Sequence, residues 1–133
     1  MIRVAIVDDN QINRITIKEK LLPYQNIKLV FEAINGENYF EKLKSLSKEQ
    51  YPNVVLMDLE MPILDGIATI ATGSVKYPDI KYIVLTIYED DDKIFDSICA
   101  GADGYILKKA SLSELMNAIE VVCEGGAPMT PSI

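Results

Sequence analysis

Acidic residues follow two apolar runs of this chain, directly where each run ends. Asp8 and Asp9 come after residues 2–7, and Asp58 comes after residues 54–57. If the two runs are neighbouring parallel strands, three carboxylates meet at one edge of a sheet. Carboxylates this close repel one another unless a cation joins them. The spacing therefore predicts a site that gathers a divalent metal ion and then uses the most accessible carboxylate.

Two further polar residues end apolar runs in the same way. Thr86 closes the run 80–86, and Lys108 follows the run 104–107. Each residue also has an ordinary structural explanation, since Asp9 can cap a helix that begins near residue 10, Thr86 suits a strand and Lys108 suits a solvated surface. Together, however, one hydroxyl, one ammonium and three carboxylates at one edge favour a functional site.

This set of groups is suited to phosphoryl transfer onto a carboxylate. Mg²⁺ binds through one or two carboxylates plus phosphate oxygens, and Asp8, Asp9 and Asp58 can supply the carboxylates. During transfer, charge spreads over the phosphoryl oxygens, where the Lys108 ammonium and the Thr86 hydroxyl can stabilise it. Asp58 would then be the nucleophile and would carry the phosphoryl group as an acyl phosphate.

The elements that must position these residues alternate along the chain. Apolar runs rich in Val, Ile and Leu alternate with segments of helical period, which is typical of parallel βαβ units and predicts an α/β fold. In such sheets, ligands bind beyond the carboxyl ends of the strands. The last helix begins at a capping box, Ser111 to Glu114, and Gly125 and Gly126 end it. The predicted strands are 2–7, 27–34, 53–57, 80–86 and 104–107.

Composition limits the classes of function. The 133 residues suit one domain. No apolar run reaches the length of a membrane span and no signal peptide is evident, so we expect a cytoplasmic protein without membrane contact. The chain has no histidine, which excludes zinc sets that contain one, and we expect Cys99 and Cys123 to be reduced core residues. A net charge of −7 opposes binding to DNA, so any DNA contact requires another segment.

Four motifs, in order, resemble the receiver domain of two-component response regulators. The resemblance covers residues 2 to 125 and implies a flavodoxin-like, CheY-like doubly wound fold with five parallel strands in the order 2-1-3-4-5. It also implies a signalling domain and not an enzyme in the usual sense. The motifs are Val7-Asp8-Asp9-Asn10, Leu56-Met57-Asp58-Leu59-Glu60-Met61-Pro62-Ile63-Leu64-Asp65-Gly66, Leu85-Thr86 and Gly101-Ala102-Asp103-Gly104-Tyr105-Ile106-Leu107-Lys108.

The resemblance implies a role for each site residue. Asp58 would accept a phosphoryl group from a histidine kinase or a phosphotransfer protein. Mg²⁺ would be held by Asp9, Asp58 and the main-chain carbonyl of Glu60, with Asp8 acting through water, and Thr86 and Lys108 would bind the phosphoryl oxygens. Met61-Pro62 and Asp65-Gly66 would shape the loop after Asp58, with glycine permitting unusual backbone angles.

The segment from Gly104 to Ser111 and the helix after it are similar to the NarL/FixJ, or LuxR-like, type of receiver. Such receivers usually precede a helix-turn-helix DNA-binding domain, which implies transcriptional control and dimerisation on phosphorylation. We expect residues 1–125 to be the receiver and residues 126–133 to begin a linker. The DNA-binding domain is then absent from this sequence, and the chain is either a fragment, which its abrupt end favours, or a stand-alone receiver or phosphorelay protein.

Some positions depart from the common receiver pattern. Lys109 stands where many receivers have a proline with a cis bond, so it removes the basis for expecting one. Ile87 replaces a common alanine and can narrow access to the phosphoryl group, while Tyr88 and Glu60 can flank an attacking water. Tyr105 lies at the family's aromatic switch position and can rotate into space that Thr86 vacates; alternatively, it is a half-buried tyrosine of an end strand.

Three other classes of protein share some of these features. A haloacid-dehalogenase-like phosphatase uses similar residues, but there the nucleophile comes early and the acidic pair late, the reverse of the order of Asp58 and Asp8-Asp9 here. A flavodoxin-like FMN carrier fits the fold, but its first loop holds a phosphate that these aspartates would repel. A degenerate receiver that acts only as an interaction surface is disfavoured because all five functional positions are present.

Overall fold

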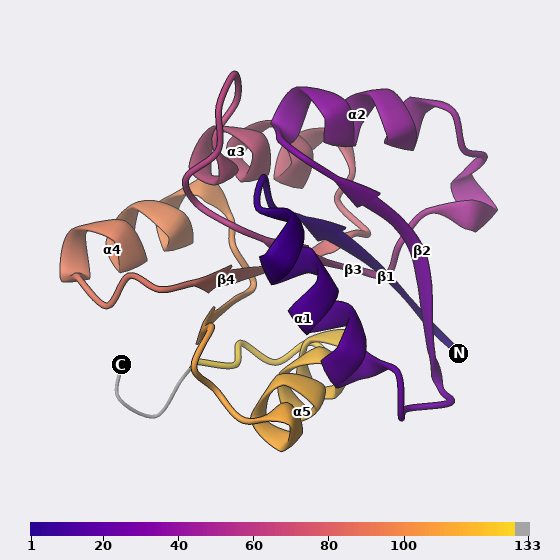
Figure 1. Cartoon of the computed structure of the whole chain (residues 1–133). Coiled ribbons are helices and arrows are strands. Elements are labelled where there is room, and N and C mark those ends of the chain that lie inside the picture. Colours follow the sequence, from indigo (N-terminus) through magenta and orange to yellow (C-terminus); the bar gives the residue numbers. More distant parts are fainter. Residues whose placement is uncertain (130–133) are drawn as a thin grey trace.

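Strands and helices alternate along the described residues, 1–129, of this computed structural model (Figure 1). The strands lie within one residue of the predicted ranges: β1 (Ile2–Val7), β2 (Ile27–Ala33), β3 (Val54–Met57), β4 (Lys81–Thr86) and β5 (Gly104–Leu107). The helices are α1 (Gln11–Leu21), α2 (Gly36–Lys44), α3 (Gly66–Lys76), α4 (Asp91–Ala100) and α5 (Leu112–Cys123), with a single 3₁₀ turn, η1 (Lys48–Gln50).

The five strands form one parallel sheet in the order β2-β1-β3-β4-β5, which confirms the predicted topology. β3 and most of β1 and β4 are fully buried, in keeping with their continuous apolar sequences. Strand order reverses between β1 and β3. The carboxyl ends of these two strands therefore border the crevice in which ligands bind in such folds.

Helices cover both faces of the sheet, with α1 and α5 on one face and α2, α3 and α4 on the other (Figure 1). Each face has its own apolar core. Ile17 of α1 and Ile119 of α5 pack into the first core, and Tyr39 of α2 and Ile70 of α3 pack into the second. Packing on both faces holds the sheet in place. The loops that carry the polar residues therefore begin from well-packed strands.

Side chains close the ends of the helices. The predicted capping box of α5 is present, with the Ser111 hydroxyl accepting from the Glu114 N–H, and Gly125 follows the helix at a φ of 91°. The cap of α1 is Asn10, whose side-chain oxygen accepts from the Asn13 N–H at 3.0 Å. The alternative in which Asp9 caps this helix is therefore wrong, and Asp9 is left free for the sheet edge.

One expectation needs correction, and part of the predicted linker has a defined place in the fold. Cys99 and Cys123 are free, as expected, but both are exposed, because each lies on the outward side of its helix. Within the predicted linker, Met129 forms a parallel bridge with Tyr105, whose N–H donates to the Pro128 carbonyl at 3.0 Å. The first residues of the predicted linker therefore lie along β5, and the division into receiver and linker stays a prediction. The rest of the predicted linker, 130–133, lies outside the described residues.

Candidate phosphoryl and metal site

The three predicted carboxylates do converge at the carboxyl edge of the sheet. Ligand oxygens of Asp8, Asp9 and Asp58 lie within 4.8 Å of one another. Asp8 is buried, Asp9 is exposed and the Asp58 side chain is 12% exposed. Hard divalent cations prefer carboxylate oxygens and retain some of their water. Three carboxylates that surround one point, with one of them open to solvent, can hold such a cation. The arrangement therefore fits a metal of that kind.

Asp8 is fixed by its neighbours. Its main-chain N–H donates to Ala33 of β2, and its side-chain Oδ1 accepts from the Asn10 N–H at 2.9 Å. Arg14, one turn into α1, donates from Nη1 to the Asp8 carbonyl at 2.8 Å. Sequence analysis did not single out Arg14. The feature of the sequence that could have indicated Arg14 is its position about one helical turn after the acidic pair. Arg14 holds the loop that carries both aspartates.

Asp58 lies partly buried at the end of β3, beside Asp8 and Lys108. Burial, followed by repulsion from Asp8, raises its pKa to about 6, although Lys108 and the hydrogen bond from the Leu59 N–H act in the opposite direction. Burial and the Asp8 charge therefore outweigh the stabilisation that Lys108 and the Leu59 N–H give to the Asp58 carboxylate. Because partial desolvation weakens the hold of water on a nucleophile, this environment suits attack on a phosphoryl group.

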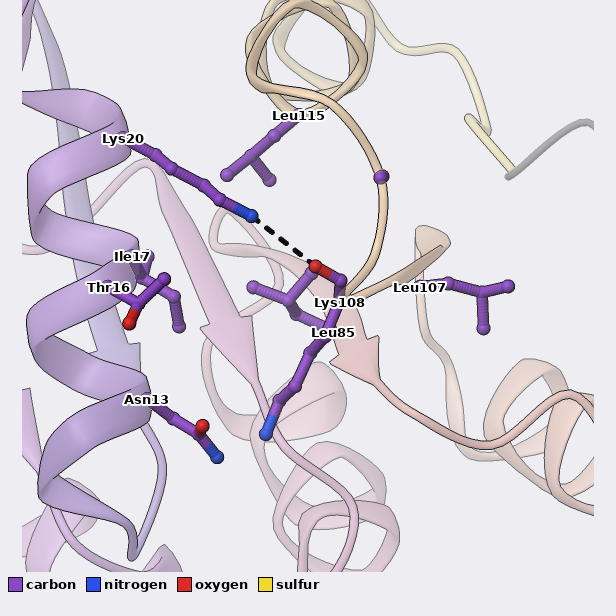
Figure 2. Close-up of a pocket in the computed structure, with 9 residues that line it drawn as sticks. Asn13, Thr16, Ile17, Lys20, Leu85, Leu107, Lys108 and Leu115 are labelled. Atoms are coloured by element: carbon purple, nitrogen blue, oxygen red, sulfur yellow. Dashed lines mark hydrogen bonds between the residues drawn. The ribbon is translucent and has the colours of Figure 1, made fainter.

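Lys108 bridges two of these carboxylates, the buried Asp8 and the half-buried Asp58. Its Nζ lies 2.8 Å from Asp8 Oδ2 and 3.4 Å from Asp58 Oδ2. Figure 2 shows the Lys108 side chain pointing away from Lys20, while the Lys108 carbonyl accepts a hydrogen bond from Lys20 Nζ at 3.3 Å. The peptide bond to Lys109, whose state the sequence left open, is trans. A cation placed between these carboxylates is in position to meet the oxygens of a phosphoryl group bound to one of them.

Thr86 and Tyr105 are linked through the loop after β4. Thr86 is fully buried and its Oγ1 accepts from the Tyr88 N–H at 3.4 Å. The Tyr105 hydroxyl donates to the Tyr88 carbonyl at 2.8 Å, and the Tyr105 side chain is only 1% exposed. The expectation of a half-buried Tyr105 is therefore wrong. Because the ring is already inside, it has no further exposure to lose in this conformation.

The loop after Asp58 depends on glycine for a reason other than the predicted one. Gly66 does not have a positive φ, whereas Ile63 in the same loop does, at 71°. A Cβ on Gly66 would lie 2.0 Å from the Asp58 carbonyl oxygen, and the Gly66 N–H donates to the Leu59 carbonyl. Gly66 is therefore needed so that α3 can approach the backbone of Asp58 closely.

Glu60, Tyr88 and Lys93 form a cluster at the outer border of the site. The sequence pointed to Glu60 and Tyr88 but not to Lys93. Lys93 of α4 lies 3.6 Å from Glu60 Oε1, and its Nζ is 4.8 Å from the centre of the Tyr88 ring. A hydrogen bond to Glu60 raises the pKa of the Tyr88 hydroxyl. Lys93 carried no motif, so only the fold reveals it. Ile87, by contrast, is 70% exposed, so most of its side chain faces solvent instead of closing the site.

The comparisons with known proteins agree with this geometry. The family model described as the response regulator receiver domain matches residues 4–120, and the chain belongs to this family. Among solved structures, a two-component response regulator of the LuxR family from Aurantimonas sp. SI85-9A1 has a TM-score of 0.89 at 25% identity, over 98% of this chain and 91% of that one. The response regulator domain of Thermotoga maritima CheB has a TM-score of 0.81 at 26% identity, over 93% and 97%.

Curated relatives point to the same type of regulator. The chain is 33% identical to the transcriptional regulatory protein DegU of Brevibacillus brevis, over 99% of this chain and 54% of DegU. It is 35% identical to the response regulator GacA of Pseudomonas viridiflava, over 100% of this chain and 60% of GacA. The NarL/FixJ, LuxR-like resemblance is thereby confirmed. The chain spans little more than half the length of these relatives.

The family also bears on what kind of protein this is. A receiver is a signalling domain and does not belong to a classical enzyme family, and it implies a kinase as its partner. Within residues 1–129, none of the helices has the length and apolar character needed to cross a bilayer. The acidic cluster at the sheet edge has the ligand oxygens that a metal ion needs.

Proposed function

We propose that Asp58 is the phosphoryl acceptor of this receiver. The observation that carries the proposal is the convergence of Asp58 with Asp8, Asp9 and Lys108 at the carboxyl edge of the sheet. An Asp58 oxygen attacks the phosphorus of a phosphohistidine on a histidine kinase or a phosphotransfer protein. The P–N bond breaks, the imidazole nitrogen takes up a proton, and Asp58 becomes an acyl phosphate.

The metal that fits the acidic cluster is Mg²⁺. Asp8, Asp9, Asp58 and the main-chain carbonyl of Glu60 would hold it, with water completing the shell. When bound, Mg²⁺ supplies positive charge to the phosphoryl oxygens. The chain's own contribution is to fix Asp58 in place and to keep Asp8 and Asp9 close beside it.

Lys108 and Thr86 would bind the phosphoryl oxygens after transfer. Lys108 is already within reach of Asp58, so its ammonium can follow the new charge with a small shift. The Thr86 hydroxyl, now the acceptor for the Tyr88 N–H, can donate to a phosphoryl oxygen by moving towards Asp58. Such a movement would pull on Tyr88 and, through its carbonyl, on Tyr105. Thr86 and Tyr105 are thus the proposed switch.

The output we propose is control of transcription. The relatives include proteins named as transcriptional regulators, and the LuxR-like similarity favours a helix-turn-helix domain as the effector. With a net charge of −7, these 133 residues are poorly suited to contact DNA themselves. We further propose a cytoplasmic location, homodimerisation on phosphorylation, and no reaction catalysed on a separate substrate. A stand-alone receiver in a phosphorelay is the alternative output for the same site.

The test is phosphorylation by a small donor. Wild-type protein is incubated with acetyl phosphate, with and without Mg²⁺, and its intact mass is measured. We expect one phosphoryl adduct that requires Mg²⁺ and is absent from Asp58→Asn. Asp79→Asn, an exposed aspartate remote from the cluster, is the matched control and should be modified like the wild type. A folded wild-type protein that acquires no adduct with Mg²⁺ present would refute the proposal.

A further inference from the structure

A cavity lies at the edge of the sheet opposite to the phosphoryl site, where β1, β3 and β4 begin. The chain end marked N in Figure 1 lies at this edge. Its volume is about 390 Å³, within the range of about 300–1,000 Å³ typical of small-molecule sites. Arg3, Tyr51 and Tyr77 line it, together with Lys48 and Lys76. None of these residues takes part in the phosphoryl site, so the cavity is unexplained by the receiver function.

The charge of this cavity is opposite to that of the protein. Three cations, Arg3, Lys48 and Lys76, line it against a single carboxylate, Asp79, in a chain with a net charge of −7. None of the three cations is within ion-pair distance of a carboxylate in the described part of the chain, whereas Arg14, Lys18, Lys93, Lys108 and Lys109 all are. A concave site with unpaired cations concentrates anions.

Arg3 is held in place with part of its guanidinium left free. Its Nε donates to the Tyr51 carbonyl at 2.7 Å, and its main-chain N–H donates to Asn53 Oδ1 at 2.8 Å. The two terminal nitrogens have no hydrogen-bond partner among residues 1–129. A guanidinium that is oriented in advance and has both terminal amino groups available is the preferred partner of a phosphate group.

The same cavity has aromatic walls. The rings of Tyr51 and Tyr77 meet edge to face, with centroids 5.5 Å apart and an interplanar angle of 82°. Tyr77 is stacked on Phe40 behind it, with centroids 6.3 Å apart, and is therefore supported in its orientation. Both tyrosines are partly exposed, so ring surface is available to a ligand. Aromatic faces bind planar rings through stacking.

We propose that this cavity binds a small organic phosphate that carries a planar ring, of the size of a mononucleotide. Arg3, Lys48 and Lys76 bind the phosphate, and Tyr51 and Tyr77 contact the ring. The cavity size favours a small molecule over an extended polymer, and the charge favours an anion. The site is separate from Asp58, so its ligand would be a second input to the domain.

The experiment is calorimetric titration of the metal-free protein with AMP, beside adenosine and inorganic phosphate as separate probes. Lys48→Gln/Lys76→Gln removes two of the three cations, and both residues are exposed. Arg3 is not replaced, because it also joins Tyr51. The matched control, Lys44→Gln/Lys109→Gln, makes the same change in net charge at exposed positions that do not line the cavity.

We expect saturable binding of AMP, weakened about tenfold in Lys48→Gln/Lys76→Gln and unchanged in the control. Adenosine and inorganic phosphate should each bind more weakly than AMP. The proposal is overturned if folded wild-type protein shows no saturable AMP binding, or if both double variants bind AMP equally. Inorganic phosphate that binds as tightly as AMP would also overturn it, because the tyrosines would then contribute nothing.

Discussion

At the scale of the residue, the environment of Asp58 makes stability depend on pH. Burial and Asp8 raise its pKa to about 6, above its value of about 3.8 in the unfolded chain. The folded protein therefore binds more protons than the unfolded chain between these values, and this contribution to stability is lost as pH rises from about 4 to about 6. We expect metal-free Asp58→Asn to lack this loss.

Thermal unfolding of both proteins in a chelator, across that pH range, measures the effect. The free energy of unfolding of the wild type should fall relative to that of Asp58→Asn as pH rises from about 4 to about 6. Above pH 6 the difference between the two proteins should stay constant. A difference that does not change with pH would show that Asp58 ionises as freely in the folded protein as in the unfolded chain.

Also at this scale, Lys93 is expected to assist the approach of an anionic phosphodonor. It neutralises Glu60, which stands at the border of the site. In Lys93→Gln the Glu60 charge is left uncompensated and repels acetyl phosphate, so phosphorylation should slow about threefold at low salt. The double variant Glu60→Gln/Lys93→Gln should recover the wild-type rate.

Initial rates of adduct formation, followed by intact mass at low and high salt, provide the measurement. Lys28→Gln removes an equal charge from an exposed position on β2 and should leave the rate unchanged. If Glu60→Gln/Lys93→Gln stays as slow as Lys93→Gln, then Lys93 does not act through Glu60.

At the scale of the element, α3 and β3 must approach each other at Gly66. The new Cβ of Gly66→Ala would lie 2.0 Å from the Asp58 carbonyl oxygen, so the loop has to shift. We expect a loss of about 1–3 kcal/mol in the free energy of unfolding, together with reduced phosphorylation, because Asp58 moves with its backbone. Urea denaturation and adduct formation measure the two effects.

Gly125→Ala is the comparison. Gly125 also has a special backbone, at a φ of 91°, but a Cβ there would meet nothing within 4 Å. Its replacement should cost about 1 kcal/mol through backbone strain and leave phosphorylation intact. Equal phosphorylation in both variants would contradict the role given to the close approach at Gly66.

The order of the strands and helices was more predictable from the sequence than the exposure and contacts of individual side chains. The strands and their order followed from apolar runs, and Asp8, Asp58 and Lys108 followed from being placed directly after such runs, because parallel strands bring their carboxyl ends together. The exposure of Cys99 was not predictable, since it depends on how far α4 is rotated about its axis. Nor was the contact of Lys93 with Glu60, which joins a helix to a loop more than thirty positions away.

At the scale of the whole molecule, metal binding and folding are expected to be linked. A cation that binds the converged carboxylates of the folded protein, and not the unfolded chain, stabilises it by about 2.7 kcal/mol at 100 times its dissociation constant. Asp9 is exposed, so Asp9→Asn should fold normally yet respond much less to Mg²⁺. Melting temperatures across a Mg²⁺ titration measure this response. An equal rise in both proteins would contradict a role for Asp9 in metal binding.

The central claim is that the phosphoryl group resides on Asp58 and not on its acidic neighbours. Protein modified with acetyl phosphate and Mg²⁺ is reduced with borohydride, which converts an aspartyl phosphate to homoserine, and is then digested and mapped by mass spectrometry. We expect homoserine at position 58 and unchanged aspartate at positions 8 and 9. Homoserine at Asp8 or Asp9, with position 58 unchanged, would contradict the claim.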